Sequence, residues 1–154
     1  MVVPRVRAAG TWMRTTISPF ALAVAWLVSM IATAGSLYLS GIAHLVPCRL
    51  CWYQRIAMYP LVLLLGIAVF RDDRYTAKRY LIPVAAVGLP ISIYHYQLER
   101  FPNQTAFVCS PEAPCSVPAV NVWGFDSVPF MAMAAFMLII TALWLARPTP
   151  DNED

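Results

Sequence analysis

Four long stretches without Asp, Glu, Lys or Arg restrict the fold of this chain more than any other feature. Three of them contain 24, 18 and 20 residues and cover 20–43, 81–98 and 127–146. The fourth, 56–70, contains only 15 residues, and it reaches 20 if the helix begins at Cys51 and Arg55 keeps its guanidinium near the membrane surface by snorkelling. Because a helix of about 20 apolar residues crosses a bilayer, we predict an all-α fold, a bundle of four membrane-spanning helices.

The composition also indicates a membrane protein. Only 12% of the residues are charged and 60% are hydrophobic, whereas soluble domains average about 25% charged residues. This composition excludes an ordinary soluble enzyme, a disordered tail and a soluble nucleic-acid-binding protein. The length of 154 residues allows one domain. We expect that single domain to act as a monomer in membrane lipid and to bind no nucleic acid.

The basic residues of the connecting segments predict how the spans are oriented. Eight of them lie in the two terminal tails and the middle loop, and three lie on the other side, within or next to the other two loops. Since loops rich in Lys and Arg stay in the cytoplasm, we expect both termini to be cytoplasmic and loops 44–50 and 99–126 to face outward. The eight are Arg5, Arg7, Arg14, Arg71, Arg74, Lys78, Arg79 and Arg147, and the three are Arg49, Arg55 and Arg100.

Three other segments carry weaker signals. The tripeptide 32–34, Ala-Thr-Ala, would suit a cleaved signal peptide. However, the apolar run continues beyond the roughly 7–15 residues of a signal core, so we expect the first span to be retained. The apolar part of the second outer loop, 119–125, predicts a segment lying on the membrane interface. The acidic residues 148–154 predict a disordered tail.

All four cysteines fall in the predicted outer loops, in two local pairs. Cys48 and Cys51 form a Cys-Arg-Leu-Cys unit, and Cys109 and Cys115 flank Ser-Pro-Glu-Ala-Pro. Structural disulfides would fit the second pair in an oxidising compartment. A Cys-x-x-Cys ring, by contrast, is small, strained and usually redox-active. Pro47 favours a helix N-terminus at the first pair, which would stabilise a thiolate, so we predict a catalytic dithiol there.

Two metal-dependent alternatives fit the cysteines less well. Four cysteines match the ligand number of a structural zinc site. The five-residue spacer of the second pair, its prolines and the oxidising compartment argue against that site, so we expect no metal. A c-type haem would require His directly after Cys-x-x-Cys, and Trp52 stands at that position.

Two dithiols on one side of a membrane suggest electron transfer by thiol–disulfide exchange. The chain carries no nucleotide-binding fingerprint, so a quinone from the bilayer fits as the two-electron acceptor. Hydrogen-bond donors to its carbonyl oxygens would be Arg55, four residues after Cys51, and His95, at similar depth in the third span. From sequence alone, Arg55 equally fits an interfacial anchor. His95 equally fits a donor that joins two helices.

The segment 48–55, Cys-Arg-Leu-Cys-Trp-Tyr-Gln-Arg, continued by Met-Tyr-Pro at 58–60, resembles the signature of the bacterial disulfide-bond-formation membrane proteins of the DsbB/BdbC type. The order of the spans and the position of the second cysteine pair are also similar over nearly the whole chain. The five-residue spacing of that pair resembles the short form of the family, whereas the longer form spaces it widely.

The resemblance implies a quinone-dependent thiol:disulfide oxidoreductase in the bacterial inner membrane. It would reoxidise a soluble extracytoplasmic thioredoxin-like thiol oxidase with a Cys-x-x-Cys site, and so support disulfide bond formation in exported proteins. Ubiquinone or menaquinone would oxidise Cys48 and Cys51, with Cys51 as the thiolate that engages the ring. Arg55 and His95 would form the quinone site.

The resemblance also assigns the second pair. Cys109 would form the mixed disulfide with the thiol oxidase, and Cys115 would exchange with Cys48 as electrons move inward. The spacing alone does not exclude a related membrane dithiol enzyme of vitamin K recycling.

Two other function classes remain as alternatives. A small four-span transporter generally needs an acidic group inside the membrane, and the four apolar stretches contain none, with Glu99 only bordering one. A membrane scaffold with stapled loops would hold structural disulfides, whose reduction potentials typically lie below about −300 mV.

Overall fold

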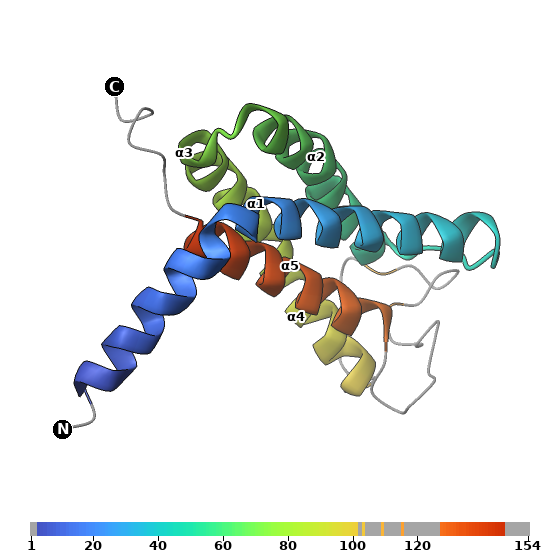
Figure 1. The fold of residues 1–154 in the computed structure, drawn as a ribbon. Helices are drawn as coiled ribbons and strands as arrows, with labels where there is room; N and C mark the ends of the chain where they lie inside the picture. The colour runs from blue at the N-terminus through green and yellow to red at the C-terminus, as the bar shows by residue number, and fades with distance from the viewer. Residues whose placement is uncertain (1–2, 102, 104–108, 110–114, 116–126, 147–154) are drawn as a thin grey trace.

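Helices make up the regular structure in the described part of the chain. The computed structural model describes residues 3–101, 103, 109, 115 and 127–146, and side chains from residue 20 onward. This part of the chain contains no strand. The predicted interfacial segment 119–125 and the tail 148–154 lie outside the described residues. The helices are α1 (Val3–Gly41), α2 (Arg49–Arg71), α3 (Arg74–Thr76), a π-helical segment (Ala77–Leu81), α4 (Ile82–Arg100) and α5 (Val128–Leu145) (Figure 1).

Four helical segments in the described part of the chain are long and apolar enough to span a membrane. Large apolar side chains on their outer surfaces, such as Leu63, Ile67 and Leu138, are exposed, as expected where lipid surrounds a bundle. The prediction of an all-α fold with four membrane spans is therefore confirmed. The four segments are Phe20–Gly41, Arg49–Arg71, Arg74–Arg100 and Val128–Leu145.

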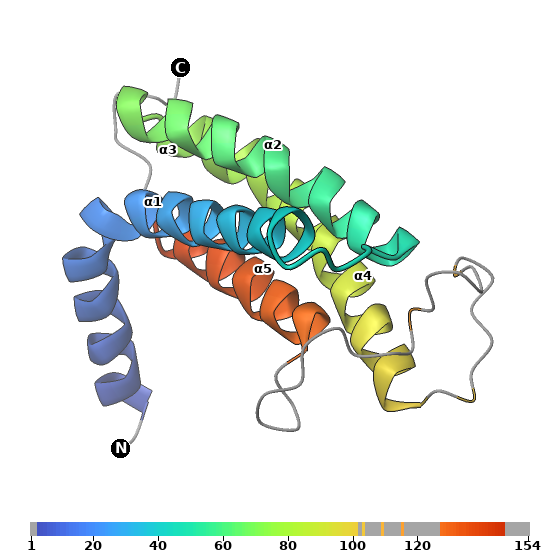
Figure 2. The same cartoon turned by 90° about the vertical axis from the view of Figure 1, so that its right-hand side faces the viewer.

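Two helical segments begin many residues before the spans predicted from the sequence. The third spanning segment begins at Arg74 rather than at residue 81, because basic side chains at a helix end can extend to the membrane surface. Similarly, α1 begins at Val3, and its first part turns away from the other helices (Figure 2). A helix in water or at a surface needs no apolar composition, so a hydropathy criterion finds only the part within the membrane.

The bundle forms a closed ring of four long helices. α1 contacts α2, α2 contacts α4, α4 contacts α5, and α5 contacts α1 (Figure 2). The centre is filled by fully buried side chains of α2 and α5 that repeat every three or four residues. They are Leu61, Leu65, Phe136, Ile139 and Leu143.

One end of the bundle is fixed by a tight turn and a side-chain cap. Asp72 adopts a left-handed conformation at the end of α2, and the Asp73 carboxylate accepts a hydrogen bond from the Thr76 N–H at 2.9 Å. Lys78 donates to the carbonyl of Trp144 at 3.1 Å, near the end of α5. A cation at a helix C-terminus is stabilised by the helix dipole, so this contact ties α5 to the start of the third span.

The closest approach between α4 and α5 is at Gly88. A Cβ added there would overlap the ring of Phe136, which is fully buried and cannot move aside. We expect Gly88→Ala to lower the free energy of unfolding by about 1–3 kcal/mol, measured as a lower midpoint of thermal unfolding in detergent. Gly41→Ala is the matched control, since no atom lies within 4 Å of its Cβ. Equal midpoints for the two variants would contradict the Gly88–Phe136 contact.

Candidate active site

The first cysteine pair lies at the N-terminus of α2. Cys48 is the N-cap residue with extended backbone, and its Sγ accepts a hydrogen bond from the Cys51 N–H at 3.4 Å. The two Sγ atoms are 3.1 Å apart, and both cysteines are free. The Cys-x-x-Cys spacing explains this arrangement, because a cap residue and the third residue of a helix face each other. The pair is therefore a reduced dithiol whose sulfurs are close enough to form a disulfide.

Negative charge is stabilised at Cys48, which lies just outside the second span. The pKa of Cys48 is lowered to about 4, mainly by its contact with the Cys51 thiol and also by His95 and the Cys51 N–H, against the opposing effect of burial. With Cys48 ionised, the Cys51 thiol is the hydrogen-bond donor. In this reduced state the negative charge thus rests on Cys48. The role of Cys51 as the thiolate that engages the quinone ring stays a prediction.

The low pKa of Cys48 has a direct consequence for pH dependence. The value of about 4 is far below the ordinary 9.0, so the reduced protein should keep one thiolate from about pH 8 down to about pH 5 and lose it as the pH falls through about 4. The fraction of thiolate at each pH is measured as the difference in ultraviolet absorbance between the reduced and the oxidised protein. His95→Ala should raise the midpoint. A wild-type midpoint near pH 9 would contradict the arrangement.

His95 joins α4 to the dithiol and is held by a residue that the sequence analysis missed. Its Nε2 is 3.5 Å from the Cys48 Sγ, and its Nδ1 is 3.3 Å from the Gln54 Nε2. Both side chains are buried. When the Gln54 amide donates to Nδ1, the imidazole proton is on Nε2 and faces the thiolate. The sequence did carry a signal for Gln54, because a glutamine inside an apolar span needs a hydrogen-bond partner there.

The second cysteine pair lies against the first. Cys109 and Cys115 form a disulfide with a Cα–Cα distance of 5.8 Å. Cys115 is buried in a small cluster with Cys48, Leu50 and Leu98. The sulfurs of Cys48 and Cys115 and a ring nitrogen of His95 all lie within 4.8 Å of one another. The fold therefore brings together the two cysteine pairs that the sequence places in separate loops.

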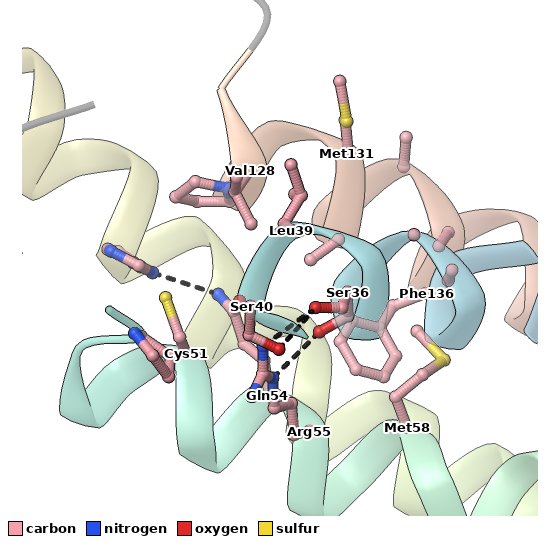
Figure 3. Close-up of a pocket in the computed structure, with 18 of the residues that line it drawn as sticks. Ser36, Leu39, Ser40, Cys51, Gln54, Arg55, Met58, Val128, Met131 and Phe136 are labelled. Atoms are coloured by element: carbon pink, nitrogen blue, oxygen red, sulfur yellow. Dashed lines mark hydrogen bonds between the residues drawn. The ribbon is translucent and has the colours of Figure 1, made fainter. Parts of the chain in front are cut away.

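Arg55 is anchored to α1. Its Nε donates to the Ser36 Oγ and its Nη2 donates to the Ser36 carbonyl, both at 2.9 Å (Figure 3). Its guanidinium carbon also lies 5.3 Å from the centre of the Trp52 ring. No sequence signal identified Ser36, because serines are common on membrane helices and form bonds within their own helix.

A cavity of about 610 Å³ lies beside these residues, between α1, α2 and α5. Cys48, Cys51, Arg55 and His95 line it, so the predicted donors share one site with the first cysteine pair. Glu99, which the sequence analysis only placed at a span border, lines it as well. Most of the remaining lining is apolar, and Figure 3 shows Leu39, Met58, Met131 and Phe136 around it.

The cavity reaches the surface that faces lipid. Ile31 of α1 and Met131 and Leu138 of α5 line it, and each of these side chains is at least half exposed on the outside of the bundle. Part of the cavity lining, on α1 and α5, therefore lies on the outer surface of the bundle.

Comparison with known proteins agrees with this site. A family model described as "Disulfide bond formation protein DsbB" matches residues 18–146. The chain is 46% identical over 127 residues to "Disulfide bond formation protein C" of Bacillus subtilis (strain 168), covering 82% of this chain and 91% of that protein. It is 41% identical over 136 residues to a "Probable disulfide formation protein" of Coxiella burnetii (strain CbuK_Q154), covering 87% and 92%.

No solved structure shows a significant match to the chain. The sequence relatives and the family model nevertheless agree with one another, and they favour the oxidoreductase over the four-span transporter and the stapled scaffold. The chain therefore belongs to the DsbB family of disulfide bond formation proteins, and it is a multi-pass membrane disulfide oxidoreductase that acts with a thiol–disulfide partner protein.

Proposed function

We propose that the protein passes electrons from a soluble thioredoxin-like thiol oxidase with a Cys-x-x-Cys site to ubiquinone or menaquinone. The observation that carries this proposal is the contact of both cysteine pairs at one end of a lipid-accessible apolar cavity. The protein would work as a monomer in the bacterial inner membrane, forming one domain over residues 1–154. Both termini would be cytoplasmic, and the cysteine loops would face outward, as the basic residues predict.

The first half of the relay involves the outer pair, Cys109 and Cys115, and the second half also involves the inner pair, Cys48 and Cys51. A thiolate of the partner attacks the Cys109 sulfur, which forms a mixed disulfide and breaks the Cys109–Cys115 bond. The second partner thiol then attacks the partner sulfur of that mixed disulfide. The partner is released with a disulfide, and Cys109 and Cys115 remain in this protein as two thiols.

The second half moves the electron pair inward. The Cys115 thiolate attacks Cys48 of the Cys48–Cys51 disulfide and releases Cys51. Cys109 then attacks Cys115, restores the outer disulfide and releases Cys48. The low pKa of Cys48 makes it a good leaving group in this step. The resulting state, with an oxidised outer pair and a reduced inner pair, is the one that the structure holds.

The cavity fits a quinone as the acceptor. Its volume is within the roughly 300–1,000 Å³ of small-molecule sites. The Tyr59 side chain lines it, and the Tyr59 hydroxyl is buried with no hydrogen-bond partner in the described part of the chain. Arg55 would donate to one carbonyl oxygen, and His95 would donate to the other through the Nε2–H that otherwise faces Cys48. A bound quinone supplies an acceptor for the two electrons and two protons that Cys48 and Cys51 release when they form their disulfide.

The proposal is tested by mixing purified protein, a reduced Cys-x-x-Cys partner and quinone, and following quinol formation. We expect multiple turnovers with the wild type and none with Cys51→Ser. Quinol formation that is absent in the wild type, or undiminished in Cys51→Ser, would reject it.

A further inference from the structure

We infer that the fully reduced protein binds one thiophilic divalent cation, such as Zn²⁺, through Cys48, Cys115 and His95. The sulfur atoms of the two cysteines and a ring nitrogen of the histidine lie within 4.8 Å of one another. These residues come from the cap of α2, the second loop and α4. The proposed relay accounts for the proximity of the two sulfurs, and the imidazole nitrogen beside both of them adds a third donor.

The donor set suits such an ion. Thiolates and imidazoles are the usual ligands of Zn²⁺, at about 2.3 Å and about 2.0–2.1 Å, so two donors on one tetrahedral ion are separated by less than about 4 Å. Small displacements would bring Cys48, Cys115 and His95 to that spacing. The Cys51 Sγ lies 3.1 Å from the Cys48 Sγ and offers a fourth donor. Three cysteines and one histidine form a common closed zinc site.

The surroundings of the three donors also favour ligation. Cys48, Cys115 and His95 are each at most 6% exposed, so little water competes for the ion. Ligation through Nε2 of His95 requires the proton on Nδ1, and metal-bound histidines usually donate that proton to a neighbour. The carboxamide of Gln54, 3.3 Å from Nδ1, can rotate to present its oxygen as the acceptor.

Binding depends on the redox state of the outer pair. In the structure Cys115 is bonded to Cys109, and a disulfide sulfur is not a thiolate ligand. Reduction of that bond completes the donor set. Cys48 binds as the thiolate that it already is, Cys115 and Cys51 each release one proton when they form a metal–sulfur bond, and no atom changes oxidation state. A bound ion would hold Cys48 and Cys115 and so stop exchange between the two pairs.

The two outer cysteines provide a matched pair of variants for the test. Cys109→Ser and Cys115→Ser each remove the same disulfide, but only Cys115→Ser removes a proposed ligand. The detergent-solubilised full chain, reduced with a phosphine, is titrated with Co²⁺, and the thiolate-to-cobalt charge-transfer absorption is recorded. We expect one Co²⁺ per chain in the wild type and in Cys109→Ser, and displacement of Co²⁺ by Zn²⁺.

Affinity for Co²⁺ should fall at least about tenfold in Cys115→Ser and in His95→Ala. Equal affinities in Cys109→Ser and Cys115→Ser, or no charge-transfer band in the reduced wild type, would overturn the inference. An unchanged affinity in His95→Ala would remove the histidine from the site and overturn it as stated. Because the titration contains no quinone and no partner protein, its failure leaves the proposed relay untouched.

Discussion

Replacing Cys48 with serine should lower the rate of quinone reduction at least about a thousandfold, as expected when a nucleophile that forms covalent intermediates is lost. Cys48 contacts both Cys51, at 3.1 Å, and Cys115, within 4.8 Å, so it links the two pairs and also belongs to the inner one. A serine hydroxyl cannot form either disulfide. The steady-state loss of quinone absorbance with a reduced partner protein measures the effect.

A double variant of the outer pair separates loss of the relay from loss of the acceptor site. Cys109→Ser/Cys115→Ser should also lose turnover with the protein partner. It should keep turnover with a small dithiol that reaches the inner pair directly, whereas Cys48→Ser should lose turnover with both donors. A rate for Cys48→Ser within tenfold of the wild type would contradict its central position.

Replacing Arg55 with methionine should raise the KM for quinone by about 10- to 100-fold. A hydrogen bond from a charged donor contributes about 1.5–3 kcal/mol, and each 1.4 kcal/mol corresponds to about a tenfold change. Arg55 lines the cavity, and methionine keeps a long apolar side chain without the charge. Initial rates against quinone concentration, at a fixed concentration of reduced partner, give the KM.

Ser36→Ala is the control for the anchoring of Arg55. It removes the hydroxyl that accepts from Nε but keeps the carbonyl that accepts from Nη2. Loss of one of these two bonds leaves the Arg55 guanidinium in the cavity lining, so it should change the KM less than the loss of Arg55. An unchanged KM in Arg55→Met, or an equal effect in both variants, would exclude Arg55 as a quinone ligand.

The sequence was sufficient for the spans because burial in lipid requires length and the absence of charge, and both can be counted along a chain. It also predicted Arg55 and His95 at similar depth from their positions along the spans, and both line the cavity beside the first cysteine pair. It was less informative at helix ends such as Arg74, where basic side chains extend to the membrane surface.

The rotation of each helix about its axis was not predictable. Lipid and the interior of the bundle are both apolar, so hydrophobic periodicity does not distinguish the face that contacts other helices from the face that contacts lipid. The contact of Gly88 with Phe136 and the bond from Arg55 to Ser36 depend on that rotation. The proximity of Cys115 to Cys48 depends on how a loop folds over the bundle, for which local sequence carries no signal.

Counting electrons tests the proposed relay most directly. The fully reduced protein holds four thiols, and each disulfide that forms releases two electrons. Without a partner and without oxygen, excess quinone should yield two quinols per wild-type chain, one per chain of Cys109→Ser/Cys115→Ser and none with Cys48→Ser/Cys51→Ser. One quinol per wild-type chain, or any from the variant that lacks the inner pair, would contradict electron flow through both pairs to quinone.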